Sequence, residues 1–223
     1  MAVVDATFWQ QYTGQTLAGP DVAACQLWCE AVSAAIERML WPLVVEPVTR
    51  TDILDAPPHR DLVLRHRPVR SVTWLQFNPF ADGVPSRFGP THTLVAGEDY
   101  ELVVDDPGAG LSRCGIVRRL GGRVWGVTRW GSPGTLAPRL HGIRGAVRVE
   151  AAVGFLTVPE DIRAAAVTAV TLCWNRRRLG TPVTSESWNG YSASWSPQLV
   201  ATAAVQSPDV LALLRPYLTP RFA

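Results

Sequence analysis

Two segments with helical periodicity enclose a long segment with strand periodicity, and this order limits the folds open to the chain. Apolar residues recur every three or four positions over about 21–40, where Pro42 ends the pattern. A second helical pattern over about 159–179 begins with acidic residues and ends with arginines, as the helix dipole favours. Between about 44 and 154, β-rich stretches alternate with Pro, Gly and Asp clusters. The sequence therefore predicts an α+β fold with two main helices flanking a mostly antiparallel β-rich insertion.

The expected strands of the insertion are short and are separated by turn-forming residues. They are Val48 to Leu54, Leu62 to Leu64, Ser71 to Phe77, Tyr100 to Val104, Gly115 to Leu120 and Ala146 to Val153. The run Asp105 to Gly110 is dense in turn formers, so it predicts a hairpin or an extended loop between two of them.

The composition changes after Gly180 to Ser, Thr, Asn and aromatic residues, which make a poor core. Ser207 then caps a short apolar segment at 210–214. We therefore expect a core over 1–180 and an extended C-terminal arm over 181–223, although the arm could also fold back onto its own domain. The residues expected to anchor the arm to a partner are Trp188, Tyr191, Trp195, Val210, Leu211 and Leu214.

The basic residues are all arginines, and 21 of them against 19 acidic residues give a formal net charge of only +2. This balance conceals an uneven distribution, because residues 107–149 contain no acidic residue and eight arginines: Arg113, Arg118, Arg119, Arg123, Arg129, Arg139, Arg144 and Arg148. Such a stretch can face the phosphates of DNA. It can equally face the acid-rich segment 1–64 of another subunit, so both interpretations stay open at this point.

The sequence contains no motif that supports an enzyme. The four histidines show no metal-ligand spacing, and neither a phosphate-binding loop nor a nucleophile elbow is present. None of the four cysteines forms a Cys-x-x-Cys pair, so reduced thiols are expected, with Cys25 and Cys29 as small apolar core residues. We therefore expect no catalytic activity, no cofactor and no metal. Neither a signal peptide nor a membrane span is expected.

Several segments carry a family resemblance through their order along the chain. They are the helix end Ala34–Leu40, the segment Leu62–Leu75 with its "RPVRSV" run, Asp99–Leu102, Gly115–Leu120, the strand-to-helix join Val147–Ala165 and the short motif Ser185–Ser194. Together they span most of the chain. The sequence resembles the head–tail connector or adaptor proteins of tailed bacteriophages and of phage-derived gene transfer agents.

The resemblance implies a non-enzymatic, dodecameric ring in the virion neck, assembled in the host cytoplasm. Such a ring docks beneath the portal protein through its arm, offers its other face to a stopper or tail-terminator protein, and lets double-stranded DNA pass without sequence preference. No membrane is involved. The long β-rich section departs from the smaller, mostly helical members. A tail-terminator or stopper ring protein is the main alternative, and a DNA-binding regulator is another, although no helix-turn-helix or zinc finger is evident.

Overall fold

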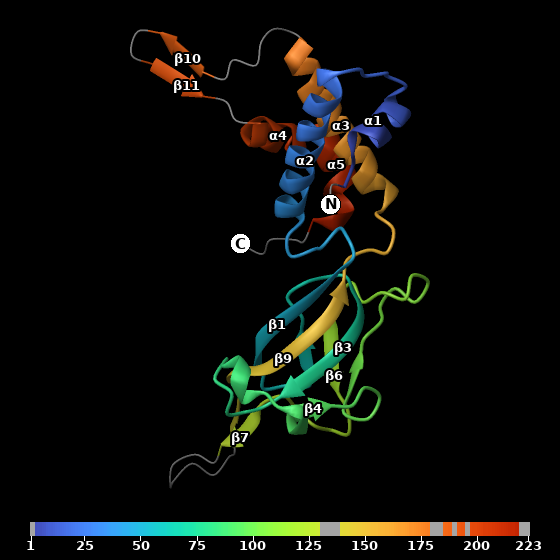
Figure 1. Cartoon of the computed structure of the whole chain (residues 1–223). Helices are drawn as coiled ribbons and strands as arrows, with labels where there is room; N and C mark the ends of the chain where they lie inside the picture. The colour runs from blue at the N-terminus through green and yellow to red at the C-terminus, as the bar shows by residue number, and fades with distance from the viewer. Residues whose placement is uncertain (1–2, 130–138, 179–184, 189–190, 195–196, 219–223) are drawn as a thin grey trace. The chain divides into compact units, whose positions relative to one another are not determined.

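The computed structural model describes residues 3–129, 139–178, 185–188, 191–194 and 197–218, which fall into two compact units (Figure 1). One unit is helical and comprises residues 1–41 and 157–223, whereas the other is built of strands and comprises residues 42–156. The chain thus enters the β unit once and leaves it once, between two helices of the helical unit. The predicted α+β class, with a β-rich insertion between two main helices, is confirmed.

The helical unit contains the two predicted helices and three short ones. Helix α2 (Pro20–Leu40) and helix α3 (Glu160–Arg178) match the expected ranges to within a residue. The short helices are α1 (Ala6–Thr13), α4 (Pro197–Val205) and α5 (Pro208–Leu214), the last followed by the 3-10 turn η3 (Arg215–Tyr217). Helices α1 and α4 lie where no helix was expected. Strands β10 (Ser185–Trp188) and β11 (Tyr191–Ser194) form a hairpin between α3 and α4.

Small side chains let α2 and α3 pack closely at the centre of this unit. Cys25 and Cys29 on α2 are completely buried, which confirms their expected role as apolar core residues. Helix α1 is fixed to the same core by Trp9, whose ring lies 5.7 Å from that of Trp174. The indole Nε1 of Trp9 donates a hydrogen bond to Thr171 Oγ1 at 3.1 Å, so this buried polar group is satisfied.

The segment after the hairpin belongs to the core of the helical unit. Helix α4 packs on α2 and α3, and α5 packs on α3. Val210 and Leu214, which were expected to form an apolar plug for a partner, are both 0% exposed. Leu211 between them is half-buried. The described part of 197–218 therefore packs against α2 and α3 as part of the helical unit, and only the hairpin remains as a candidate arm.

The β unit contains a four-stranded antiparallel sheet in the order β1-β9-β3-β4. Its strands are β1 (Val48–Ala56), β9 (Ile143–Val153), β3 (Val69–Phe77) and β4 (Thr93–Leu94). A second antiparallel sheet has the order β2-β6-β5 and consists of β2 (Asp61–Val63), β6 (Ile116–Arg119) and β5 (Tyr100–Leu102). Strands β7 (Val127–Arg129) and β8 (Arg139–His141) form a separate pair, and the 3-10 turns η1 (Pro85–Arg87) and η2 (Pro90–His92) precede β4. All six predicted strands are present, and β4, β7 and β8 were not predicted.

One apolar core joins the two main sheets, and its most buried members include Val69, Leu75, Val117 and Trp125. The chain enters and leaves the β unit at neighbouring points of this core, because Val48 on β1 pairs with Val153 on β9. Gly154 follows at φ +90°, and a Cβ there would lie 2.0 Å from the carbonyl oxygen of Glu46. The close approach of these two backbones therefore requires glycine.

Candidate functional site

Three arginines of the acid-free stretch are neutralised by aspartates of the same unit. Arg118 donates from Nε and Nη2 to the two carboxylate oxygens of Asp61, at 2.8 and 3.1 Å. Arg113 Nη2 lies 2.7 Å from Asp106 Oδ2, and Arg123 Nη1 lies 2.6 Å from Asp99 Oδ1. All three aspartates precede the acid-free stretch in sequence, so folding brings together charges that the sequence keeps apart.

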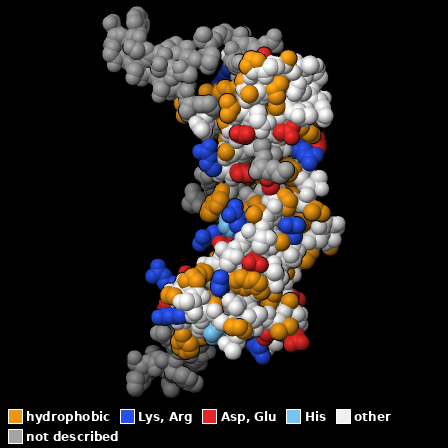
Figure 2. Space-filling model, in the orientation of Figure 1, with side chains coloured by type: hydrophobic (Ala, Val, Ile, Leu, Met, Phe, Trp, Pro, Cys, Tyr) orange, Lys and Arg blue, Asp and Glu red, His pale blue; other side chains and the backbone are white. Residues whose placement is uncertain are grey.

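These pairs are surface ion pairs, and they shape the local electrostatics more than the stability. Hydrogen bonding from Arg118 lowers the pKa of the Asp61 carboxyl below its ordinary value of 3.8. The carboxylate therefore stays ionised through the physiological range. Figure 2 shows acidic and basic side chains interspersed on the visible face of the β unit, in place of a continuous basic surface.

Arg119 belongs to the core of the β unit and does not line a surface. Its side chain is 7% exposed, and its guanidinium carbon lies 5.1 Å from the Trp125 ring centroid and 5.7 Å from that of Phe77. Its Nε and Nη1 atoms have no hydrogen-bond partner among the residues that the structure describes. Burial lowers the pKa of this guanidinium below its ordinary value. The expected role of Arg119 at a subunit interface or DNA channel does not fit this buried position.

The remaining arginines of the stretch take different positions. Arg148 on β9 stacks over Trp74, with its guanidinium carbon 5.2 Å from the ring centroid, whereas Arg144 is exposed. The register of the β7–β8 pair places Arg129 opposite Arg139, and the side chains of both lie outside the described residues. The eight arginines therefore do not form one surface, which sequence spacing could not have revealed.

The hairpin β10–β11 separates its residues by type. Its register pairs Trp188 with Tyr191 and Glu186 with Ala193, so these four positions share one face. The alternate positions, which share the other face, are all serines: Ser185, Ser187, Ser192 and Ser194. Trp195, the third expected aromatic anchor, lies outside the described residues. The register thus places the two aromatic residues of the hairpin at positions on one side and the four serines at positions on the other, and their side chains lie outside the described residues.

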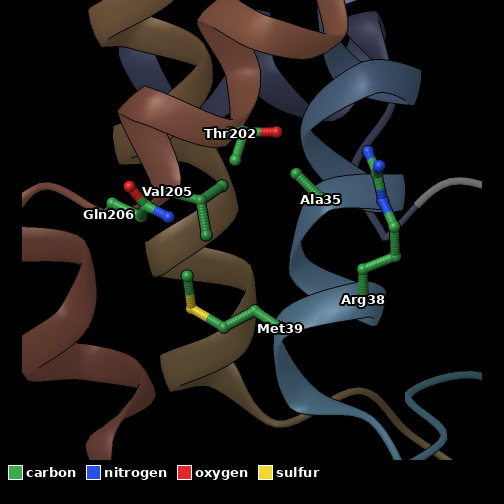
Figure 3. Close-up of a pocket in the computed structure, with 6 residues that line it drawn as sticks. All are labelled: Ala35, Arg38, Met39, Thr202, Val205 and Gln206. Atoms are coloured by element: carbon green, nitrogen blue, oxygen red, sulfur yellow. The ribbon is translucent and has the colours of Figure 1, made fainter.

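A groove between α2 and α4, with a volume of about 240 Å³, was not predicted from the sequence. Figure 3 shows Ala35 and Met39 on α2 facing Val205 on α4. Its other lining residues are polar: Arg38, Thr202 and Gln206. The sequence interpretation missed this groove because it treated 197–205 as part of an arm, although the recurrence of Val200, Ala201, Ala204 and Val205 would have indicated a helix.

Two chemical possibilities find no support in the part of the chain that the structure describes. No group of three or more His, Cys, Asp or Glu residues is placed to hold a metal ion among those residues. Within the same ranges, no helix combines the length and the apolar character that a bilayer crossing needs. The surface features described above are the hairpin, the α2–α4 groove and the exposed Arg144.

No family model matches the sequence, and no curated protein matches it either. Solved structures do show a similar fold. One is a chain in the neck of an empty GTA (gene transfer agent) particle with C6 symmetry, which superimposes with a TM-score of 0.56 at 18% identity over 99% of this chain and 92% of that chain. Another, in the neck of a native GTA particle with C12 symmetry, gives a TM-score of 0.50 at 19% identity over 90% and 85% of the two chains. In its fold, therefore, the protein is similar to neck proteins of gene transfer agent particles.

Proposed function

We propose that this protein is a structural component of the neck of a phage-like or gene transfer agent particle, where identical copies form a ring. The observation that carries the proposal is the extent of the structural likeness, which covers 99% of this chain and 92% of its neighbour. The likeness therefore extends over both the helical unit and the inserted β unit. A shared combination of two such units is more informative than a shared single domain.

The proposed ring has twelve subunits. The two similar chains belong to necks with C6 and C12 symmetry, and a dodecamer is compatible with both. A closed ring needs a heterologous contact, in which two different patches of each subunit meet.

Within the neck we propose the role of a portal-side adaptor, with the hairpin β10–β11 as the portal-binding arm. A two-stranded hairpin on its own is marginally stable in water, so the aromatic face with Trp188 and Tyr191 favours a docked state. Trp195 follows as a further anchor. Each arm needs only modest affinity, because many arms around a ring act together.

The DNA contact of such a ring is weak and indifferent to sequence. Arg113, Arg118 and Arg123 are already paired with aspartates. Arg129, Arg139 and Arg144 remain as candidates to face the phosphates of passing DNA. A structural role of this kind requires no catalytic residue, cofactor or metal.

The test combines assembly with partner binding. We expect native mass spectrometry of the purified protein, alone and with the portal protein from the same particle, to show a dodecameric ring. Replacing residues 185–194 by a short Gly-Ser linker should abolish co-purification with the portal. The thermal unfolding transition of the helical unit should stay unchanged. Replacing Ser187 and Ser192 by Thr, on the polar face, is the matched control and should leave portal binding unchanged.

Two outcomes would contradict this role. A protein that stays monomeric at every concentration, with and without portal, would exclude the ring. A ring that ignores the portal but binds the tail-side protein would instead identify a stopper or tail-terminator.

A further inference from the structure

Phe80 is a large apolar side chain that the β unit holds out to solvent. It is 79% exposed, more than any other large apolar side chain among the described residues. It lies in the loop between β3 and the turn η1, and Val84 on the same loop is also exposed. Aromatic residues, Phe included, are enriched at protein interfaces, so this ring is a candidate binding anchor.

The loop that carries Phe80 is rigidly built. Asn78 is 7% exposed, accepts the Phe80 N–H through Oδ1 at 3.0 Å and donates from Nδ2 to the Arg87 carbonyl at 2.7 Å. Arg87 Nη1 donates to the Phe80 carbonyl and to Asp82 Oδ2, each at 3.0 Å. Because the loop backbone is held from both sides, docking the ring of Phe80 requires little additional ordering.

A second set of contacts fixes this loop to the central strand of the sheet. Gly83 N–H donates to the Gly145 carbonyl of β9 at 3.0 Å, and the two backbones touch. A Cβ on Gly145 would lie 2.3 Å from the Gly83 nitrogen. The position of the Phe80 loop therefore depends on the best-paired strand of the β unit.

The groove between α2 and α4 has the shape and chemistry that such an anchor needs. Its apolar floor consists of Ala35, Met39 and Val205, and its volume of about 240 Å³ is sufficient for a phenyl ring. Met39 is an adaptable partner for an aromatic ring because its thioether is polarisable. Figure 3 shows the side chains of Met39 and Val205 directed toward the space between the two helices.

We propose that Phe80 of one copy inserts into the α2–α4 groove of a neighbouring copy and forms part of the ring contact. Arg38 lies at the groove, where its guanidinium can stack on the inserted ring, and the Phe80 loop brings no opposing net charge because Asp82 is paired with Arg87. This chain already places arginines against aromatic rings elsewhere, as at Arg148 with Trp74 and Arg163 with Phe8.

The anchor belongs to the β unit and the groove to the helical unit, so each copy can give its anchor to one neighbour and receive the anchor of another, which makes the proposed contact heterologous. A contact between two different patches propagates from copy to copy until a ring closes. The inference rests on the proposed function, because it assumes the ring and identifies one contact between neighbouring subunits.

The first experiment compares substitutions on the two sides of the contact. Phe80→Ala should weaken association about 30-fold per contact, the loss typical of a buried aromatic anchor. Val95→Ala is its control, since Val95 is another exposed apolar residue of the β unit, at 51% against 79% for Phe80. Thr202→Trp should fill the groove and prevent ring formation, whereas Ala203→Trp, on the exposed side of α4, should not. Mass photometry over a concentration series measures the association of all four variants, after circular dichroism has shown that each variant folds.

The second experiment identifies the contact directly. A photoreactive benzoylphenylalanine at position 80 is mixed with ¹⁵N-labelled wild-type protein and irradiated. We expect cross-links from the unlabelled chain to labelled peptides that contain Met39 or Val205. Cross-links only within one chain, or only to other surfaces, would overturn the inference, and so would occupation of the groove by the chain's own residues 219–223.

The two proposals fail in different ways. A ring that forms equally well with Phe80→Ala and Thr202→Trp would reject this contact and leave the neck function in place. A wild-type protein that forms no ring, alone or with portal, would reject both.

Discussion

Individual arginines differ in role more than their spacing in the sequence suggests, and Arg119 is the clearest case. It belongs to the same acid-free stretch as Arg118, yet Arg118 pairs with Asp61 at the surface while Arg119 lies between Phe77 and Trp125. The alternation of β6 places these neighbours on opposite faces. The alternation alone could have predicted that one of the two arginines points inward. It could not have predicted the aromatic partners of Arg119, because one of them, Phe77, is distant in sequence.

We predict that Arg119 stabilises the β unit through packing and that its charge contributes little. Arg119→Ala should lower the free energy of unfolding by about 2 kcal/mol or more, because it leaves a gap between two aromatic rings. Arg119→Met should change it by about 1 kcal/mol or less, because it keeps the volume and removes a buried charge. Urea unfolding monitored by tryptophan fluorescence measures the free energy of unfolding of both variants. A Met variant as unstable as the Ala variant would show that the charge itself is required.

The buried thiols give a prediction about pH. Burial raises the pKa of Cys173 from 9.0 to about 11, and burial also raises the pKa values of Cys25 and Cys29. The folded state thus favours the neutral thiol, so this contribution to stability is complete below pH 9 and is lost as the pH rises above it. We expect the free energy of unfolding of the helical unit to fall between pH 9 and 11.

Thiol alkylation checks the same assignment at constant pH. With iodoacetamide at pH 8, Cys114, which is partly exposed, should react first, and the three buried cysteines should react only after unfolding. Rapid labelling of Cys25 or Cys173 in the native protein, observed by mass spectrometry, would contradict the buried positions.

At the scale of elements, the sequence predicted the long periodic segments and failed on the short ones. Helices α2 and α3 have apolar stripes and clear end signals, so their boundaries were predictable to within a residue. Helix α4 is nine residues long and begins at a proline, and Ser and Trp residues precede it, which favoured an arm. The spacing of its apolar residues would have indicated a helix, but its packing against α2 and α3, which places it in the core, is revealed only by the fold.

The corrected position of α5 leads to a stability prediction. Leu214 is 0% exposed beneath α3, so Leu214→Ala should destabilise the helical unit by about 2–5 kcal/mol. Leu211 is only half-buried, and Leu211→Ala should cost less than half as much. Thermal unfolding by circular dichroism compares the two. Equal and small effects would place 208–214 outside the core, as the interpretation of 181–223 as a single arm implied.

At the scale of the whole molecule, the distribution of charge shows why sequence alone could not identify the binding surfaces. The acid-free stretch suggested either a DNA-facing surface or a contact with an acidic neighbour. Folding pairs Arg113, Arg118 and Arg123 with Asp106, Asp61 and Asp99, so much of that charge is balanced inside one subunit. The candidate surfaces that remain combine apolar and polar residues at the hairpin and the groove, together with the exposed ring of Phe80.

The insertion of one unit into the other gives the last prediction. The β unit begins and ends at neighbouring points, since Val48 pairs with Val153 and the Gly154 N–H bonds to the Pro68 carbonyl within the same unit. Each unit also has its own buried core. We therefore expect each unit to unfold cooperatively in calorimetry when it is expressed alone. The two pieces are residues 42–156, and residues 1–41 joined to 157–223 by a short Gly-Ser linker.

Because the proposed ring contact joins the Phe80 loop of one unit to the groove of the other, neither piece alone should assemble. A ring formed by the helical piece by itself would show that the β unit is dispensable for assembly, and a piece without a cooperative transition would show that the two units stabilise each other.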